Sequence, residues 1–210
     1  MEVVIQLLLS GISQGCVYGL IALGFVLIYK ATEMVNFAQG EIMMFGAFFA
    51  FTFISILELN FFLAIAATIV SMAICGALLE RVVLRPMIGE PPFSVLMLTI
   101  GLGFLLRAIA GAVWGSEPRS LSAPYTGGVF NVQGVIIGYE NLVIIAGTAL
   151  LCSLLFVFFK FSRLGIAMQA ASQNQLAAYY VGIPVKRIYS LVWALSAAIS
   201  AVAGILVAPV

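Results

Sequence analysis

Six long runs of apolar residues divide this chain, and they constrain its fold more than any other feature. The runs fall at about 3–28, 42–57, 61–79, 93–113, 142–159 and 190–208. A helix needs about 20 apolar residues to cross the hydrocarbon core of a bilayer. Of the 210 residues, 64% are hydrophobic and only 8% are charged, too few to build a water-soluble surface. The pattern predicts one all-α domain over residues 1–210, a polytopic transmembrane helix bundle of about six spans.

The second apolar run is the shortest and follows a polar interruption. Asn36, Gln39 and Glu41 separate it from the first run, and residues 42–57 form only about 24 Å of helix at 1.5 Å per residue. That is short of the ~30 Å hydrocarbon core. A broken or re-entrant helix that starts within the membrane reconciles the lengths, because irregular backbone is tolerated at depth beside protein or water. The alternative is a cytoplasmic turn at a helix start.

Basic residues gather in alternate connections between the runs. Connections 29–41, 80–92 and 160–189 hold Lys30, Arg81, Arg85, Lys160, Arg163, Lys186 and Arg187. Connection 114–141 has a single basic residue, Arg119. Loops rich in Lys and Arg stay in the cytoplasm. We therefore predict that these three connections face the cytoplasm, and that the N-terminus and 114–141 face outside.

Two features within the runs predict helix packing. Small residues recur every four positions in the first and last runs, at Gly11, Gly15, Gly19 and at Ser196, Ser200, Gly204, which stacks them on one helix face and allows close backbone approach. Arg107 is the one basic residue well inside an apolar run. A charge there is expected to snorkel to the interface, to pair with a structural partner or to serve a function.

The residues that most enzymes need are missing. The sequence contains no His and no Asp, so it offers no Ser-His-Asp triad and lacks the common nitrogen ligand of metals. No GxxxxGK[ST] phosphate loop occurs, so an ATP-dependent role requires a nucleotide site on another chain. A net charge of +1 gives a nucleic acid no electrostatic support. We expect neither an enzyme nor a cofactor or metal protein, and no nucleic-acid partner.

Two stretches of sequence resemble one family of membrane proteins. The first runs from Gly15-Cys-Val-Tyr-Gly-Leu-Ile-Ala-Leu-Gly24 through Val35-Asn-Phe-Ala-Gln-Gly-Glu41 to Gly46-Ala47. The second runs from Ser162-Arg-Leu-Gly-Ile-Ala-Met-Gln169 to Val181-Gly-Ile183. Together they resemble the permease subunits of branched-chain amino acid ABC transporters, and the shorter, LivH-like type in particular. Members usually continue through further membrane helices, so the resemblance leaves open whether the chain is a fragment or a shortened homologue.

The connection 160–189 is the expected coupling loop. Its stretch from Gly165 to Val181 is rich in Ala and Gln and is bounded by Gly182 and Pro184, which predicts a short helix outside the bilayer. In the family that this chain resembles, an equivalent helix docks on the ATPase subunit. The resemblance assigns this role to Arg163, Gly165, Gln169, Asn174, Ala177, Gly182 and Ile183. The alternative is an ordinary solvated loop.

The resemblance implies a multi-pass protein of a prokaryotic plasma (inner) membrane, working with several partners. These are a second permease subunit, two ATP-binding cassette ATPases, an extracytoplasmic solute-binding protein and the lipid bilayer. Leucine, isoleucine and valine are the default solutes, while urea, short amides and other small polar molecules stay open. We expect the translocation pathway to be lined or gated by Asn36, Phe37, Gln39, Gly40 and Glu41. An ion-coupled secondary transporter or a channel is the competing interpretation.

Overall fold

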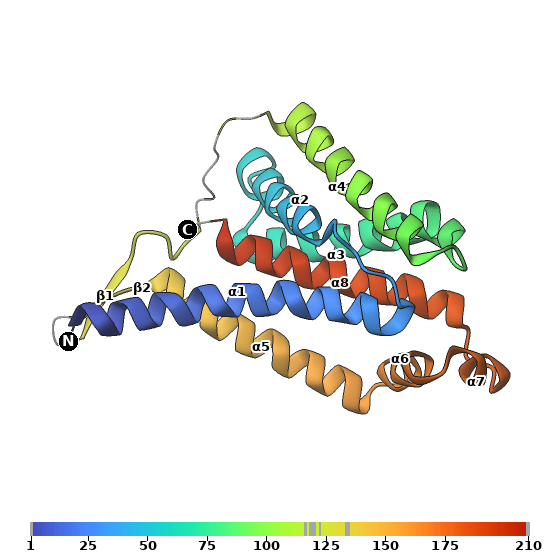
Figure 1. Cartoon of the computed structure of the whole chain (residues 1–210). Helices are drawn as coiled ribbons and strands as arrows, with labels where there is room; N and C mark the ends of the chain where they lie inside the picture. Colours follow the sequence, from blue (N-terminus) through green and yellow to red (C-terminus); the bar gives the residue numbers. More distant parts are fainter. Residues whose placement is uncertain (1, 116, 118–120, 122, 133–134, 209–210) are drawn as a thin grey trace.

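The structure, a computed structural model, describes residues 2–115, 117, 121, 123–132 and 135–208. It is a bundle of helices with one small β-hairpin (Figure 1). The long helices are α1 (Glu2–Thr32), α2 (Gln39–Phe51), α3 (Phe61–Leu79), α4 (Pro92–Trp114), α5 (Tyr139–Phe161) and α8 (Val185–Val207). The short helices are α6 (Arg163–Gln173), α7 (Gln175–Tyr180), the π-helical turns η1 (Thr52–Ile56) and η2 (Glu80–Leu84), and the 3-10 turn η3 (Arg85–Met87).

Among the described residues, six helical stretches are long and apolar enough to cross a membrane, which confirms the predicted all-α polytopic bundle. They are Val3–Thr32, Gln39–Ile56, Phe61–Met87, Pro92–Trp114, Tyr139–Phe161 and Val185–Val207. Their boundaries differ from the apolar runs mainly at the third stretch. There η2 and η3 continue α3 through residues that were expected to belong to the connection 80–92. The π-helical turn keeps the backbone hydrogen-bonded there, so the polar residues Glu80 and Arg81 extend the helix.

Helix α8 forms the centre of the bundle. In Figure 1 it lies between α1 on one side and α2 and α3 on the other. Its face is almost fully buried, with Trp193 1% exposed and Ser200 0% exposed. One apolar cluster joins it to α2, α3, α4, α6 and the end of α1, and a second joins it to α1 and α5. Because α8 packs against α1, α2, α3 and α5, it gives these helices a common apolar surface to bury.

Glycines let two neighbours approach the α8 backbone closely. A Cβ added at Gly46 of α2 would lie 2.5 Å from Ala201 Cα, and one at Gly76 of α3 would lie 2.5 Å from the Trp193 carbonyl oxygen. On α8 itself, a Cβ at Gly204 would meet the Met43 carbonyl. This confirms the predicted small-residue packing for the last span. In the first span it is not seen, because Cβ atoms added at Gly11, Gly15 and Gly19 meet no neighbour within 4 Å among the described residues.

The hairpin and helices α6 and α7 lie at opposite ends of the bundle (Figure 1). Strands β1 (Val129–Val132) and β2 (Val135–Gly138) pair antiparallel, with Val129 opposite Gly138, near the start of α1. Helices α6 and α7 lie at the far end, beside the end of α1 and the start of α8 (Figure 1). We call this second end the basic end, because it carries Lys30, Arg81, Arg85, Lys160, Arg163, Lys186 and Arg187. Its cytoplasmic orientation stays a prediction, and Arg119 lies outside the described residues.

Candidate functional site

The chain breaks between α1 and α2 and returns into the bundle. Helix α1 ends at Thr32, and the next residue, Glu33, takes a positive φ of 57°, which turns the backbone away from the helix axis. Residues 33–38 then run back from the basic end to the start of α2 (Figure 1). Gln39, the first residue of α2, contacts Ser196, the middle residue of α8. Helix α2 therefore begins at mid-height in the bundle, which agrees with the predicted broken helix and not with a turn outside the bilayer.

Two of the predicted pathway residues, Asn36 and Gln39, are buried and hold this break in place. Gln39 Nε2 donates to Ser200 Oγ at 2.7 Å and to Ser196 Oγ at 3.2 Å, and Ser196 Oγ donates to the Gly24 carbonyl at 2.9 Å. Asn36 Nδ2 donates to Gln39 Oε1 at 3.1 Å. Asn36 is 1% exposed and Gln39 is 4% exposed, so both amides form their hydrogen bonds inside the bundle. They tie the segment to α1 and α8, as buried polar groups require.

Of the other three predicted pathway residues, Phe37 and Gly40 face outward, and the Glu41 side chain lies beside α4 with 18% exposure. Phe37 is 54% exposed, and a Cβ added at Gly40 meets no neighbour among the described residues. Glu41 Oε1 accepts a hydrogen bond from Arg107 Nη2 of α4 at 2.7 Å, and the Arg107 side chain is 67% exposed. We call Phe37, Gly40, Glu41 and Arg107 the ion-pair face. Pairing across helices was one of the outcomes expected for Arg107.

Helix α4 supports this face along its length. The Phe37 N–H donates to Thr99 Oγ1 at 3.3 Å, and Thr99 Oγ1 donates to the Val35 carbonyl at 3.3 Å. At the far end of the same helices, Trp114 Nε1 donates to Thr52 Oγ1 at 2.8 Å, and the indole stacks on Phe48 with ring centroids 5.1 Å apart. The re-entrant segment is thus clamped between α4 and α8, which fixes the Glu41 side chain beside Arg107.

Helix α6 forms the first half of the predicted coupling loop and packs tightly on the end of α5. Ser162 caps it, since Ser162 Oγ accepts from the Gly165 N–H at 2.8 Å. Gly165 is buried against the backbone of Phe158, where a Cβ would collide. Gln169 Nε2 donates to the Phe159 carbonyl at 3.1 Å. Gly165 and Gln169 therefore position α6, while Arg163 is exposed at its start.

Helix α7 forms the second half, so the expected single helix is divided in two at Asn174. Asn174 Oδ1 caps α7 by accepting from the Ala177 N–H at 2.9 Å. Gly182, with φ 87°, ends the turn after α7, and Ile183 packs against the main apolar cluster. Ala177 is exposed. Of the seven predicted coupling residues, four have exposed side chains: Arg163, Gln169, Asn174 and Ala177. Gln169 and Asn174 also position α6 and α7 through their hydrogen bonds, and Gly182 shapes the backbone.

Large apolar side chains on and after α7 point away from the bundle, and the residue list from the sequence missed them. Tyr180 is 82% exposed, Val181 77%, Leu176 70% and Tyr179 68%. We call these four residues the α7 patch. They lie at the basic end, where the next turn of chain leads into α8. The pair Tyr179 and Tyr180, in a polar connection, was the sequence signal that could have identified this patch. Exposed apolar clusters mark protein contacts.

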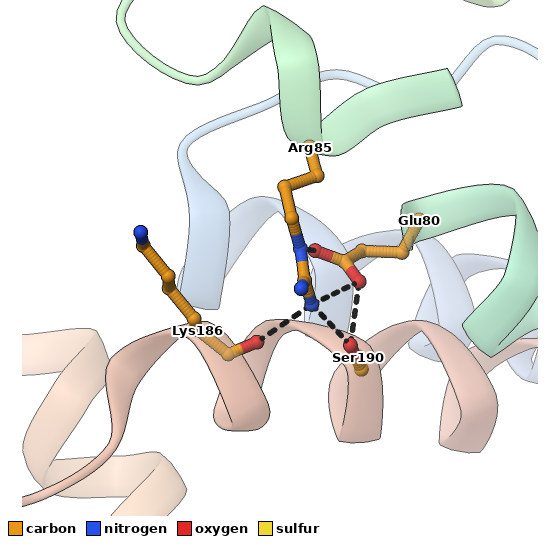
Figure 2. A network of polar contacts seen from close by, with 4 residues as sticks. All are labelled: Glu80, Arg85, Lys186 and Ser190. Atoms are coloured by element: carbon orange, nitrogen blue, oxygen red, sulfur yellow. Dashed lines mark hydrogen bonds and ion pairs between the residues drawn. The ribbon is translucent and has the colours of Figure 1, made fainter. Parts of the chain in front are cut away.

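A polar network joins the end of α3 to the start of α8 (Figure 2). Glu80, 2% exposed, accepts from Arg85 Nε at 3.1 Å and from Arg85 Nη2 at 2.9 Å. Ser190 Oγ donates to Glu80 Oε2 at 2.5 Å, and Arg85 Nη2 also reaches the Lys186 carbonyl at 3.2 Å. Figure 2 shows the Arg85 guanidinium directed across the gap between the two helices toward α8. The network therefore couples α3 to the helix that follows α7.

Removing Arg85 is expected to destabilise the bundle, because it leaves the buried Glu80 carboxylate without its charge partner. Arg85→Ala should lower the free energy of unfolding by about 3 kcal/mol, the lower end for a broken buried pair since Arg85 is partly exposed. The exposed neighbour Arg81→Ala should change it by about 0.5 kcal/mol or less. The Glu80→Met/Arg85→Met variant, which removes both charges, should recover most of the loss. Reversible denaturation in mixed micelles measures all three, and equal stability of Arg85→Ala and Arg81→Ala would contradict the role of the pair.

The architecture and the comparisons together assign the chain to a family. In the described part of the chain, six membrane-length helices, one of which begins at mid-height beside an ion pair, define a polytopic membrane protein of the transport class. Among the described residues, no three His, Cys, Asp or Glu side chains gather to hold a metal. The chain belongs to the branched-chain amino acid transport system permease component family, whose model matches residues 7–210. It is therefore a permease subunit and a multi-pass inner-membrane protein.

Three relatives illustrate the match. The high-affinity branched-chain amino acid transport system permease protein BraD of Pseudomonas aeruginosa is 32% identical, over 96% of this chain and 70% of its own length. The corresponding permease protein LivH of Escherichia coli strain K12 is 30% identical over the same shares. The probable branched-chain amino acid transport permease protein LivH of Methanocaldococcus jannaschii is 29% identical, over 88% of this chain and 60% of its own length. No solved structure matches significantly.

Proposed function

We propose that this chain lines the translocation pathway of an ATP-driven importer for branched-chain amino acids. The names of its relatives support the solute class, and the family membership supports transport. Its partners in this proposal are a second permease subunit, two ATPases that bind and hydrolyse the nucleotide, and a solute-binding protein outside the membrane. The chain itself contains no GxxxxGK[ST] phosphate loop, so the nucleotide site belongs to the ATPases.

The ion-pair face is the observation that carries the pathway proposal. Glu41 lies in the first turn of α2, which begins at the level of the middle of α8, and Arg107 beside it is 67% exposed. Charged side chains at that depth are costly in hydrocarbon, so they face protein or a water-filled cavity. Transporters place their solute sites where membrane helices are broken. The residues Phe37, Gly40 and Glu41 then border the pathway, while Asn36 and Gln39 anchor the break from behind.

The two charges also suit the proposed solute. A free amino acid carries a carboxylate and an ammonium group, and Arg107 and Glu41 offer one opposite charge for each. Charge-assisted hydrogen bonds are roughly twice as strong as neutral ones, so the pair provides a transient contact as the solute passes. Phe37 supplies an apolar surface next to it for a branched aliphatic side chain.

At the basic end, α6 and α7 form the proposed coupling element. The α7 patch is apolar and exposed outside the membrane-length helices, which favours a protein partner there over an ordinary solvated loop. Arg163 and Ala177 lie open on the same two helices. Gly165, Gln169, Asn174, Gly182 and Ile183 give those helices their fixed shape. An ATPase that moves α7 would move the start of α8 with it.

Neutralising either member of the ion pair tests the pathway proposal. Glu41→Gln and Arg107→Gln should each lower ATP-dependent uptake of leucine from loaded binding protein by roughly tenfold or more, since each removes one charge-assisted contact. The measurement is radiolabelled uptake into proteoliposomes that carry the assembled complex. Glu58→Gln, which changes an exposed carboxylate between η1 and α3, is the matched control and should transport normally.

The reversed pair separates solute contact from mere packing. Glu41→Arg/Arg107→Glu keeps an ion pair but exchanges the position of the two charges. If the pair only holds α2 against α4, this variant should regain uptake. If the solute contacts the charges, the complex should assemble while uptake stays low. Normal uptake by Glu41→Gln, or full recovery by the reversed pair, would contradict the proposed contact.

A further inference from the structure

A groove of about 510 Å³ opens between α1 and α5 at the basic end, away from the ion-pair face. In Figure 1 these two helices diverge toward that end, and α6 lies near the tip of α5. Leu23, Val26, Leu27 and Ala31 of α1 and Cys152, Leu155, Phe156 and Phe159 of α5 form its walls. Met168 and Val192 close its depth, and Lys30, Gln169, Ser172 and Gln173 form its remaining lining.

The lining changes from apolar to polar along the groove. Leu23 and Cys152 mark its membrane-facing part, whereas Lys30 near the end of α1 and the amides of α6 mark its basic-end part. Lys160 does not line the groove, but its Nζ lies 5.2 Å from the ring centroid of the wall residue Phe156, which places a second positive charge beside the groove. None of the described residues that line the groove is acidic. The site thus joins an apolar slot to a positively charged mouth.

We propose that this groove binds an anionic phospholipid from the leaflet at the basic end. One acyl chain lies between α1 and α5, and the phosphate meets Lys30 and Lys160, with the Gln173 amide beside it. Charge complementarity selects this occupant, because basic pockets between membrane helices at the cytoplasmic side attract anionic headgroups. The chain direction also fits, since an acyl chain leads from the headgroup level into the hydrocarbon, as Lys30 leads to Leu23 along α1. The proposal does not depend on which solute is transported.

Such a lipid would connect the coupling element to the membrane. Gln169 and Gln173 belong to α6, while the walls belong to α1 and α5, so one bound molecule touches all three helices. Gln169 is already held on the Phe159 carbonyl at 3.1 Å, which fixes one side of the mouth. Lipid composition would then influence the position of α6.

Cys152, a wall residue that is exposed, supplies a probe position in the groove. It lies two turns before Lys160, about 12 Å along α5, which corresponds to acyl-chain depth. The experiment labels Cys152 with bimane in the full chain carrying Cys16→Ala and Cys75→Ala, in vesicles of phosphatidylglycerol and phosphatidylcholine. All vesicles have the same ratio of the two lipids. In one sample the brominated acyl chains are on phosphatidylglycerol, and in the other an equal mole fraction of them is on phosphatidylcholine. Brominated phosphatidylglycerol should quench bimane roughly threefold more strongly than brominated phosphatidylcholine.

The variants decide whether the lysines select the lipid. Lys30→Gln/Lys160→Gln should abolish the preference, while Lys186→Gln/Arg187→Gln, which removes two basic-end charges that do not line the groove, should keep it. High salt should weaken the preference. Equal quenching by both lipids in the unmodified chain, quenching by neither, or an unchanged preference in Lys30→Gln/Lys160→Gln would overturn the proposal. If neither lipid quenches the label, protein and not lipid covers the groove.

Discussion

Gly46→Leu should prevent the bundle from forming. Gly46 of α2 lies directly over α8, and even a Cβ would come within 2.5 Å of Ala201 Cα. The contact is with backbone, so no flexible side chain can move aside. A leucine forces α2 away from α8, breaking the Gln39 bonds to Ser196 and Ser200 and leaving the buried Gln39 amide nitrogen without these acceptors. We expect the amount of folded protein recovered from membranes to fall by about tenfold or more, because overpacking and unpaired polar groups add.

The matched control is Gly101→Leu on α4. Gly101 is exposed, and a Cβ there meets no neighbour within 4 Å among the described residues. Replacing glycine by leucine raises the helix propensity equally at both positions, so the two variants differ only in packing. Size-exclusion chromatography of detergent extracts, with a fluorescent fusion for quantification, measures both. Similar yields for the two variants would show that α2 and α8 are not packed as described.

Tyr180→Asp should uncouple ATP hydrolysis from transport. Tyr180 is the most exposed member of the α7 patch, and aromatic residues at the centre of an interface often contribute 2 kcal/mol or more to binding. Placing a carboxylate there should weaken ATPase docking by roughly thirtyfold. Ala177→Trp, an enlargement on the same exposed helix, should act in the same direction through steric overlap. The bundle itself should stay folded, because neither side chain is buried.

Tyr180→Phe is the control, since it keeps the ring and removes only the hydroxyl. The measurements are co-purification of the ATPases and stimulation of ATP hydrolysis by loaded binding protein in proteoliposomes. Full co-purification and normal stimulation in both Tyr180→Asp and Ala177→Trp would show that the ATPases dock elsewhere. That result would leave the pathway proposal at Glu41 and Arg107 standing, because the two sites are tested by different variants.

Sequence reasoning predicted the helices well because their signal is local. Each apolar run reports its own helix, and the short second run together with Asn36 and Gln39 indicated the break. The sequence could not predict which helices contact one another. Glu41 and Arg107 are 66 positions apart, and both fit several partners on composition alone. Six similar apolar runs also gave no sign that the last one would be the central helix.

Small-residue spacing shows the same limit. Gly11, Gly15 and Gly19 have the regular spacing of a packing face, yet within this chain they meet no close neighbour in the described part. Gly46 and Gly76, which have no such spacing, lie directly against the backbone of α8. Spacing identifies a face that permits close approach, whereas the partner is decided by the arrangement of all helices. The extension of α3 through η2 was missed because charged residues usually end an apolar span.

The Gln39 hydrogen bonds attach the start of α2 to α8, so a movement of α8 would move the start of α2 with it. The basic-end half of α8 measures about 17 Å at 1.5 Å per residue, from the turn after α7 to Ser196. It therefore has the dimensions of a rigid lever arm, and its outer end lies at the proposed coupling element. If that arm tilted by about 10°, simple geometry would displace Ser196 by on the order of 3 Å relative to the other end. Glu41 would be carried with it, and because Thr99 and Trp114 hold α4 to the same segment, the tilt would load the ion pair between Glu41 and Arg107.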